Sequence, residues 1–276
     1  MQVKLKDAAT IILLRNSPDP FVTGFEVLMV LRSPVSKFLP GLYVFPGGGI
    51  VEADCLPETE TLCAGMDRER ATSILDDISS PENALGAWTA GIRETFEEVG
   101  LLMAYKKDES VVSLDSEEPL RDRLASHRRL LHEGKADFYD IMRSERLILA
   151  ADRLHYFSHW ITPEPSSIRY DVRFFVAEAP SGQEALHDDI ELTRYIWITP
   201  GDALKKFHEE AFGMVLPTFI TMEELSGYKT IEDVIRSTKG KKVQTTMTRV
   251  IIDKDETMVE YAPDGRAFKV DPYTKK

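Results

Sequence analysis

Three glutamates stand close together near the middle of the chain, at positions 94, 97 and 98. In an α-helix, residues three and four positions apart lie on one face, so Glu94, Glu97 and Glu98 would present their carboxylates side by side. Like charges this close destabilise one another unless a cation neutralises them. Hard divalent cations such as Mg²⁺ take carboxylate oxygens together with water and phosphate oxygens. The spacing therefore indicates a metal site, with Arg93 beside it to orient a carboxylate.

The alternative for such a helix is an ordinary solvated face, where most glutamates of globular proteins lie. Two features favour the metal site. The cluster falls in the last turns of a helix expected at 81–99, near the negative end of the helix dipole, where added carboxylates are disfavoured. A glycine-rich segment, 46–49, precedes the helix and offers backbone that can approach a ligand closely.

The helix that carries the glutamates has defined ends in the sequence. Ser80 suits the N-cap, Pro81 the first helical position and Gly100 the position just past the end. The apolar residues between these ends recur every three or four positions, which predicts a buried helical face. They are Leu85, Trp88, Ile92, Phe96 and Val99.

Short apolar segments on both sides of this helix predict a sheet, and helical patterns predict further helices. The first two strands suggest a hairpin, and the acidic segment 52–83 carries a helical patch. We expect strands at about 8–14, 25–31, 154–161, 172–179 and 193–198, helical segments at about 66–77, 117–150, 200–210, 217–225 and 231–237, and a closing hairpin of 247–252 with 258–261.

The composition excludes several classes of protein. Hydrophobic residues make up 43% and charged residues 29% of the 276 residues, as in soluble globular proteins. The net charge of −12 argues against a nonspecific nucleic-acid binder, and no apolar run approaches a membrane span. Two cysteines, Cys55 and Cys63, lack the spacing of a metal site and fit a reducing compartment, so we expect a cytoplasmic protein.

The segment 93–101, RETFEEVGL, resembles the second half of the Nudix box, G-x5-E-x7-R-E-U-x-E-E-x-G-U, in which U is aliphatic. Thr95 occupies one of the aliphatic positions. The segment 46–49, PGGG, resembles the loop that opens the box. The family pattern places the first glycine and the arginine 14 positions apart, whereas Arg93 follows Gly48 by 45, so 31 residues are inserted. The first glutamate of the pattern falls on Asp54, which leaves that carboxylate in doubt.

A box split in this way resembles the coenzyme A diphosphatase branch of the Nudix hydrolases, and segments 31–33, 45–48, 159–163 and 169–175 also fit that branch. The resemblance implies an α+β fold, an α/β/α sandwich around a mixed β-sheet with helical insertions. We expect a Nudix domain at 1–240 with insertions at about 55–83 and 110–150, and a C-terminal hairpin extension at 241–276.

The resemblance also implies roles for the residues of the box. Glu97 and Glu98 would be the main ligands of Mg²⁺ or Mn²⁺, and Glu94 would be a third ligand or would position the attacking water. Arg93 would be the structural partner of a loop carboxylate. A backbone carbonyl in the glycine segment, of Gly48 or its neighbour Gly47, could complete the metal site.

Many members recruit one more acid from a distant loop, and Glu191 is the candidate here, with Asp188 and Asp189 as rivals. A solvated loop acid is the alternative for each. Four cationic side chains are candidates for binding the non-scissile phosphates, and surface salt bridges are the alternative for them. These candidates are Arg32, Lys37, Arg169 and Arg173.

The expected function is metal-dependent hydrolysis of a diphosphate linkage in a nucleoside diphosphate derivative, with coenzyme A or an acyl-CoA as the favoured substrate. ADP-ribose, NADH or another dinucleotide is an alternative with the same chemistry. A non-catalytic Nudix-fold ligand-binding module is a further alternative, although such modules usually lose the box acids that are present here. The expected partner is a small molecule, without nucleic acid or membrane, and a homodimer is an open alternative. The 55–83 insertion could be a lid that contacts substrate or a dimer contact.

Overall fold

The protein is built around a mixed β-sheet. The computed structural model describes residues 3–21, 23–75, 77–115, 117–164, 166–186, 192–252 and 258–270. The strand order is β10-β7-β8-β1-β2-β3, with β4 also beside β1 and β9 beside β2. β1 runs parallel to β8 and antiparallel to β2. The strands are β1 (Leu5–Asn16), β2 (Phe25–Arg32), β3 (Tyr43–Val44), β4 (Gly47–Gly49), β7 (His155–Ile161), β8 (Arg169–Glu178), β9 (Leu192–Ile198) and β10 (Thr245–Met247).

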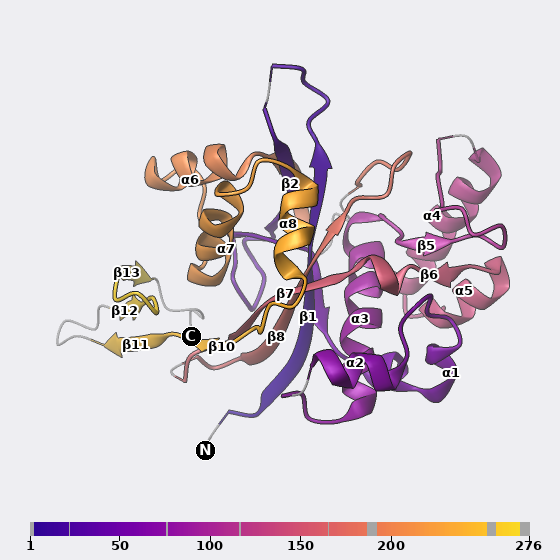
Figure 1. Cartoon of the computed structure of the whole chain (residues 1–276), viewed down its shortest axis with the longest axis horizontal. Helices are drawn as coiled ribbons and strands as arrows, with labels where there is room; N and C mark the ends of the chain where they lie inside the picture. The colour runs from indigo at the N-terminus through magenta and orange to yellow at the C-terminus, as the bar shows by residue number, and fades with distance from the viewer. Residues whose placement is uncertain are drawn as a thin grey trace.

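Helices cover both faces of this sheet (Figure 1). On one face lie α1 (Pro57–Glu60), α2 (Arg68–Ile74), α3 (Pro81–Val99), α4 (Glu118–His132) and α5 (Phe138–Glu145), with the short 3₁₀ turns η1 (Glu52–Cys55) and η2 (Ala151–Arg153). On the other lie α6 (Pro200–His208), α7 (Leu216–Ser226) and α8 (Ile231–Thr238). The predicted α/β/α sandwich around a mixed sheet is therefore confirmed.

The central strand β1 separates two hydrophobic cores. Ile11 and Leu13 pack in the core that contains Trp88 of α3, whereas Ile12 and Leu14 pack in the core that contains Phe219 of α7. Alternate residues of a strand point to opposite faces, and both faces of β1 are covered by helices. This explains why its sequence is continuously apolar rather than alternating.

The helix α3 begins and ends where the sequence predicted. The Ser80 hydroxyl accepts a hydrogen bond from the backbone N–H of Asn83 at 3.2 Å, and Gly100 adopts φ = 71°, a left-handed conformation that suits glycine. Within the described residues, no helix is long and apolar enough to cross a membrane.

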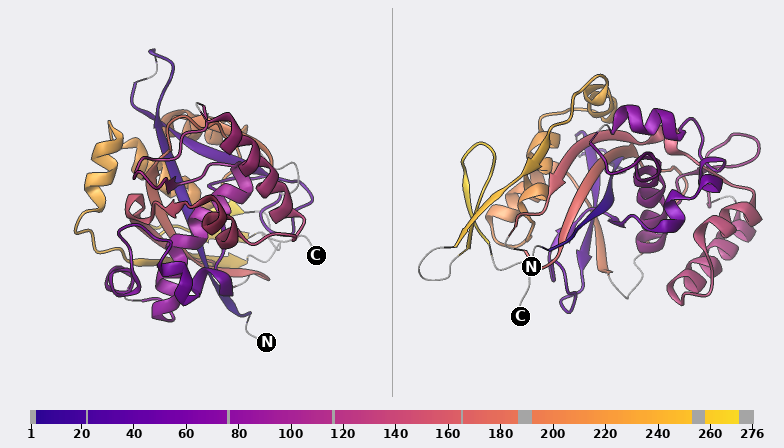
Figure 2. Two further views of the ribbon diagram at one scale, coloured as in Figure 1. Left: turned by 90° about the vertical axis from the view of Figure 1, so that its right-hand side faces the viewer. Right: turned by 90° about the horizontal axis from the view of Figure 1, so that it is seen from below.

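Two small sheets lie outside the main one. β5 (Ala104–Tyr105) pairs with β6 (Ile148–Leu149), and β11 (Arg249–Ile252), β12 (Met258–Tyr261) and β13 (Ala267–Val270) form an antiparallel sheet at the end of the molecule far from α4 and α5 (Figure 2). The expected closing hairpin is present, since Arg249–Ile252 pairs antiparallel with Met258–Tyr261, but its first strand does not extend back to Met247. The strand breaks at Thr248, because Met247 pairs with Ile161 in the main sheet and Arg249 pairs with Tyr261 in the small one.

Candidate active site

The glycine segment β4 joins the central strand to the acidic helix. It pairs antiparallel with β1, so that Gly48 lies opposite Ala9. On its other side, the backbone N–H of Gly47 donates a hydrogen bond to the Glu98 carboxylate at 2.9 Å. Segments 51 residues apart in the chain are thus brought into direct contact.

Gly48 leaves the space that the Glu94 side chain occupies. A Cβ atom at position 48 would lie 2.4 Å from Cδ of Glu94 and 2.5 Å from its Oε1, which is closer than real contacts allow. Glu94 and the three glycines line one cavity, whose wall also contains Ala8 and Thr10 of β1. The missing side chain of Gly48 therefore lets a glutamate from the α3 layer reach a cavity on the other face of β1.

Arg93 contacts three carboxylates of the site, those of Asp54, Glu94 and Glu97. Its Nε and Nη2 atoms donate to the two carboxylate oxygens of Asp54 at 2.8 and 2.9 Å, and Nη2 also donates to the carbonyl of Gly49 at 3.0 Å. Nη1 donates to Glu94 at 2.8 Å and to Glu97 at 3.3 Å. One buried guanidinium thus fixes the loop, the glycine segment and two of the glutamates.

Asp54 is the loop carboxylate that pairs with Arg93. It is fully buried and also accepts hydrogen bonds from the Val51 N–H at 2.8 Å and the Tyr139 hydroxyl at 2.5 Å. Burial, reinforced by the Asp54 charge, raises the pKa of Tyr139, so its hydroxyl stays protonated and donates. Because these donors occupy both its oxygens, Asp54 serves as an anchor for Arg93.

Burial alters the acidity of the glutamates. Loss of solvent raises the pKa of Glu94 to about 7; the nearby Arg93 opposes this shift and the Glu97 charge adds to it. Burial raises the pKa of Glu97 as well, again against Arg93. These carboxylates are therefore in an environment where additional positive charge would be favourable.

Arg128 of α4 holds the last turn of α3. Its guanidinium donates to the backbone carbonyls of Glu97 at 2.8 Å and of Glu98 at 2.7 Å. The last carbonyls of a helix have no partner within the helix, and a cation there also suits the helix dipole. The segment 110–150 thus supplies both this contact and Tyr139.

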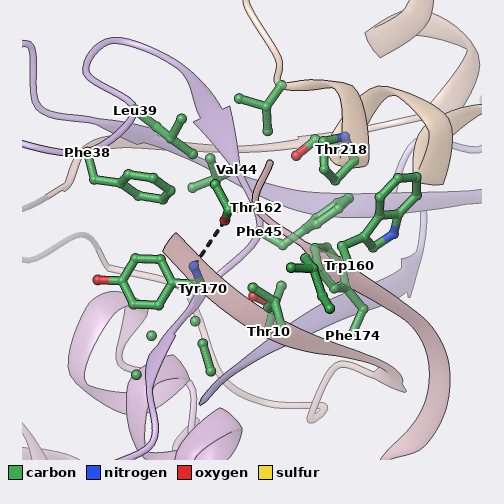
Figure 3. Close-up of a pocket in the computed structure, with 18 of the residues that line it drawn as sticks. Thr10, Phe38, Leu39, Val44, Phe45, Trp160, Thr162, Tyr170, Phe174 and Thr218 are labelled. Carbon is green, nitrogen blue, oxygen red and sulfur yellow. Dashed lines mark hydrogen bonds between the residues drawn. The ribbon is translucent and has the colours of Figure 1, made fainter. Parts of the chain in front are cut away.

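The cavity beside the glutamates has a volume of about 330 Å³, and its wall includes several aromatic side chains (Figure 3). Phe38 and Tyr170 lie edge to face, 5.2 Å apart, on one side, and Trp160 and Thr218 lie on the other. The remaining labelled wall residues are Thr10, Leu39, Val44, Phe45, Thr162 and Phe174.

Comparison with known proteins agrees with this geometry. The model of the NUDT19 Nudix domain matches residues 84–225, just over half of the chain. The chain belongs to this Nudix family. It is 22% identical over 277 residues to a protein named acyl-coenzyme A diphosphatase NUDT19 from Xenopus laevis, covering 91% of this chain and 73% of the relative. It is 24% identical to the protein of the same name from Gallus gallus, covering 97% and 80%.

A solved structure shows the same fold. The crystal structure of a Nudix hydrolase from Alicyclobacillus acidocaldarius superposes with a TM-score of 0.66 at 22% sequence identity. The similarity covers 86% of this chain and 97% of that one. The protein thus has the Nudix fold.

The fold brings together the Nudix-box residues that the sequence predicted. Glu94, Glu97 and Glu98 meet the glycine segment around Gly48, and Arg93 lies among them. Among the described residues, however, no three His, Cys, Asp or Glu side chains are grouped so as to hold a metal ion. Glu191 and its rivals Asp188 and Asp189 lie outside the described residues.

The four predicted phosphate-binding cations are placed differently. Arg32 lines the cavity, with Nε donating to the Phe38 carbonyl at 2.9 Å, whereas Lys37 is exposed and lies outside the cavity wall. Arg169 is buried and donates to the Thr162 carbonyl at 2.9 Å. The structure therefore brings only Arg32 of these first three to the cavity.

Arg173 lies on the opposite face of β8 from the cavity. Its neighbours Val172 and Phe174 line the cavity, so strand alternation directs the intervening side chain away from it. Arg173 is fully buried and pairs with Asp7, Asp77 and Asp171 at 3.2, 3.3 and 2.5 Å. The structure thus gives Arg173 a place in a buried ion cluster and not in a phosphate site.

Sequence reasoning missed several residues of the site. Nothing in the local pattern connects Tyr139 or Arg128 to the Nudix box, because both act through contacts between distant segments. Glu260 was also missed, although a charged residue inside the apolar strand MVEY (258–261) is a signal of a special environment. Glu260 is fully buried, and with Thr248 it lines the cavity.

Proposed function

We propose that this Nudix protein hydrolyses the diphosphate bond of coenzyme A or an acyl-CoA, using Mg²⁺ or Mn²⁺ held by Glu97 and Glu98 with Glu94 nearby. The observation that carries the proposal is the continuity of the acidic site with the cavity, since Glu94 and Gly48 line it. An elongated substrate can thus place its diphosphate at the glutamates and another part in the cavity. The names of the relatives from Xenopus laevis and Gallus gallus support this substrate class.

The oxygen donors at the site are of the type that a hard divalent cation prefers, although the described side chains are not grouped around one point in this structure. Three glutamates and the carbonyl of Gly48 offer oxygen ligands, and burial of Glu94, which raises its pKa to about 7, leaves a carboxylate that a cation would stabilise. A bound cation neutralises diphosphate charge and increases the acidity of water. Nudix hydrolases generally use divalent metal ions, and the ion for this chain is part of the proposal.

The side chains of the protein have separate tasks in this proposal. Arg93, fixed by Asp54, orients Glu94 and Glu97 through Nη1. Glu94 accepts the proton of the attacking water, because it lines the cavity beside the proposed metal site. Arg32 contacts a non-scissile phosphate from the cavity wall. The role of Glu191 as a further ligand stays a prediction.

A substrate panel tests the function. The protein is incubated with Mg²⁺ or Mn²⁺ and with CoA, an acyl-CoA, ADP-ribose, NADH or diadenosine polyphosphates, and the products are separated by chromatography. Release of adenosine 3′,5′-bisphosphate and phosphopantetheine from CoA is the expected result. Turnover of ADP-ribose, NADH or dinucleotides without turnover of CoA would contradict the proposed substrate.

Replacement of one carboxylate tests the metal site. Glu98→Gln keeps an oxygen that can accept from the Gly47 N–H but removes the charge, so we expect kcat/KM to fall on the order of a hundredfold. Glu82→Gln, at the exposed start of the same helix, is the matched control and should retain full activity. Full activity of the Glu98 variant would exclude the proposed metal ligand.

A further inference from the structure

A second pocket lies among the helices on the α3 side of the sheet, beside α5, β5 and β6 (Figure 1). Its volume is about 830 Å³, within the range of sites that bind small molecules. Among the described residues, its wall has no member in common with the wall of the cavity beside the glutamates. A molecule bound in this second pocket would therefore leave that cavity open.

Two inserted segments build the second pocket. Leu62 and Ala64 belong to the insertion within the Nudix box, whereas α5 and the residues after it belong to the other insertion. Backbone hydrogen bonds join the two insertions, because the N–H of Ala64 donates to the Leu149 carbonyl at 2.9 Å and the N–H of Leu149 donates to the Leu62 carbonyl at 2.7 Å. Together with residues 105–109, the insertions thus form a pocket of their own.

The wall of this pocket is basic although the chain is acidic. The net charge of the protein is −12, but cationic side chains outnumber acidic ones among the described residues of the wall. The cations are Lys106, Lys107, Arg143 and Arg146, and the acids are Glu109 and Asp152. Lys106 pairs with Glu117 at 2.6 Å, and Arg143 pairs with Asp140 at 2.8 Å. The side chains of Lys107 and Arg146 are exposed and have no hydrogen bond or ion pair within the described part of the chain, so they are available to an anion.

Arg146 stands where the backbone favours glycine. It follows α5 with φ = 56°, and the N–H of Arg146 donates to the Arg143 carbonyl while the N–H of Leu147 donates to the Met142 carbonyl. A side chain costs free energy in this left-handed conformation, so glycine is common at such helix ends. Arg143 already places a cation in the last turn of α5, where it suits the helix dipole. The benefit of Arg146 therefore lies in its guanidinium, which lines the pocket.

The acidic side chains of the wall restrict the kind of anion that fits. Asp152 is exposed and accepts a hydrogen bond from the Tyr105 hydroxyl at 3.0 Å, and Glu109 is exposed as well. Carboxylates repel a ligand that is anionic throughout, but they accept hydrogen bonds from hydroxyl groups. Tyr105 and Ile148 are partly exposed and add surface for a carbon skeleton. The wall therefore suits a ligand that has one anionic group and several hydroxyls.

We propose that this pocket is a second binding site, separate from the acidic site, for a phosphate monoester that carries hydroxyl groups, as sugar and nucleoside phosphates do. The phosphate of such a ligand carries nearly two negative charges at neutral pH, which matches the two available cations, Lys107 and Arg146. Asp152 accepts a hydrogen bond from a hydroxyl of the ligand. The site does not depend on which diphosphate the protein hydrolyses.

Calorimetric titration of the full, metal-free chain tests the proposal. The probes are ribose 5-phosphate, AMP, inorganic phosphate and adenosine. We expect the first two to bind, inorganic phosphate to bind at least tenfold more weakly because it lacks the hydroxyl contacts, and adenosine to show no measurable binding. Equal affinities of ribose 5-phosphate and AMP assign the pocket to sugar phosphates, and tighter binding of AMP assigns it to nucleotides.

Arg146→Gly separates binding from folding. It removes the guanidinium, so the affinity for both phosphate monoesters should fall about tenfold. It also relieves the left-handed conformation, so the midpoint of urea unfolding should not decrease. Glu210→Gly is the matched control, because Glu210 follows α6 with φ = 58° and the same hydrogen-bond pattern but lies outside the pocket wall. This control should act on unfolding in the same direction and leave both affinities within twofold.

A further variant locates the bound phosphate. Arg32→Met removes the cation from the wall of the other cavity and should leave the affinity for ribose 5-phosphate within twofold. Loss of binding in this variant, without loss in Arg146→Gly, would place the phosphate beside the glutamates and overturn the proposal. Absence of binding by both phosphate monoesters, or an affinity unchanged by Arg146→Gly, would overturn it as well. Inorganic phosphate that binds as tightly as ribose 5-phosphate would contradict the role of the hydroxyl groups.

Discussion

The guanidinium of one residue, Arg93, fixes the positions of the carboxylates in the acidic site. Arg93 binds Asp54 with two parallel hydrogen bonds, which sets both the position and the plane of its head group. The remaining nitrogen then holds Glu94 and Glu97. A lysine could not replace it, because an ammonium lacks the planar fork that satisfies Asp54 and the Gly49 carbonyl together.

The raised pKa of Glu94 predicts a stability that depends on pH in the metal-free protein. A carboxyl whose pKa rises on folding binds its proton more tightly in the folded state, so stability falls as pH increases from about 4.5 to about 7. With chelator present, the free energy of unfolding of the wild type should fall by about 2 to 3 kcal/mol more than that of Glu94→Gln when the pH is raised from 5 to 8. Urea unfolding at both pH values measures this, and a difference independent of pH would contradict it.

Gly48 and Gly49 allow a matched comparison of neighbouring residues. Gly48→Ala would displace the Glu94 carboxylate, which is the flexible end of a side chain, so we expect a stability loss of about 1 kcal/mol but at least a tenfold loss of kcat/KM. Gly49→Ala meets no atom within 4 Å and should retain activity within about twofold. Equal effects of the two variants on kinetics and unfolding would show that the space at Gly48 is irrelevant.

At the scale of elements, α3 is held at both ends by residues outside the Nudix box. Ser80 satisfies the first turn and Arg128 binds the carbonyls of the last turn, where Glu97 and Glu98 lie. The start of the helix is encoded locally by Ser80 and Pro81, and this is why its bounds could be predicted from sequence. The contact from Arg128 joins residues about 30 positions apart, which no local pattern reveals.

Removal of the Arg128 guanidinium should therefore loosen the acidic turn. Arg128→Ala loses two hydrogen bonds and a favourable charge at the helix end, so we expect about 1 to 3 kcal/mol of destabilisation and faster amide exchange near Glu98. Arg129→Ala, one position along and exposed, should change stability by less than about 0.5 kcal/mol. Hydrogen exchange with denaturant unfolding checks both, and identical profiles for the two variants would refute the role of Arg128.

At the scale of the whole molecule, a buried ion cluster joins distant parts of the chain. Arg173 of β8 contacts Asp7 of β1 and Asp77 before α3, and His159 of β7 contacts both Asp77 and Asp171. The sequence revealed the residue types here but not their partners. Charge and spacing alone made Arg173 look like a phosphate ligand, because the face to which a strand residue points depends on sheet pairing.

Replacement of Arg173 should therefore affect folding more than substrate binding. Arg173→Met leaves three carboxylates without their shared cation and should cost about 3 to 5 kcal/mol in unfolding free energy, with KM for CoA unchanged in the folded protein. Arg236→Met, on the exposed face of α8, is the control. Retained stability together with a raised KM would return Arg173 to the substrate site.

The long strands and most helices were predictable because each carries a local pattern, either a continuous apolar run or a helical spacing of apolar residues, whereas the short strands β3 and β4 carry none. The site was predictable in part, since Glu94, Glu97 and Glu98 share one helix and lie in one motif. The cavity wall was not, because it combines the glycine segment with Glu260 at the far end of the chain. Such a wall depends on which strands pair, and pairing between distant segments leaves little trace in a single sequence.

The Nudix box is split between Gly48 and Arg93, yet the contact between its two halves is kept. The extra 31 residues leave the site after Asp54 and return before α3, and the Asp54–Arg93 ion pair joins the two ends. The entropy of closing a loop grows only with the logarithm of its length, so each doubling costs about 0.6 kcal/mol. A longer loop therefore adds surface to the protein with little loss of stability. A sequence search that requires the Asp54–Arg93 pair, and not a fixed spacing within the Nudix box, would recognise further proteins of this kind.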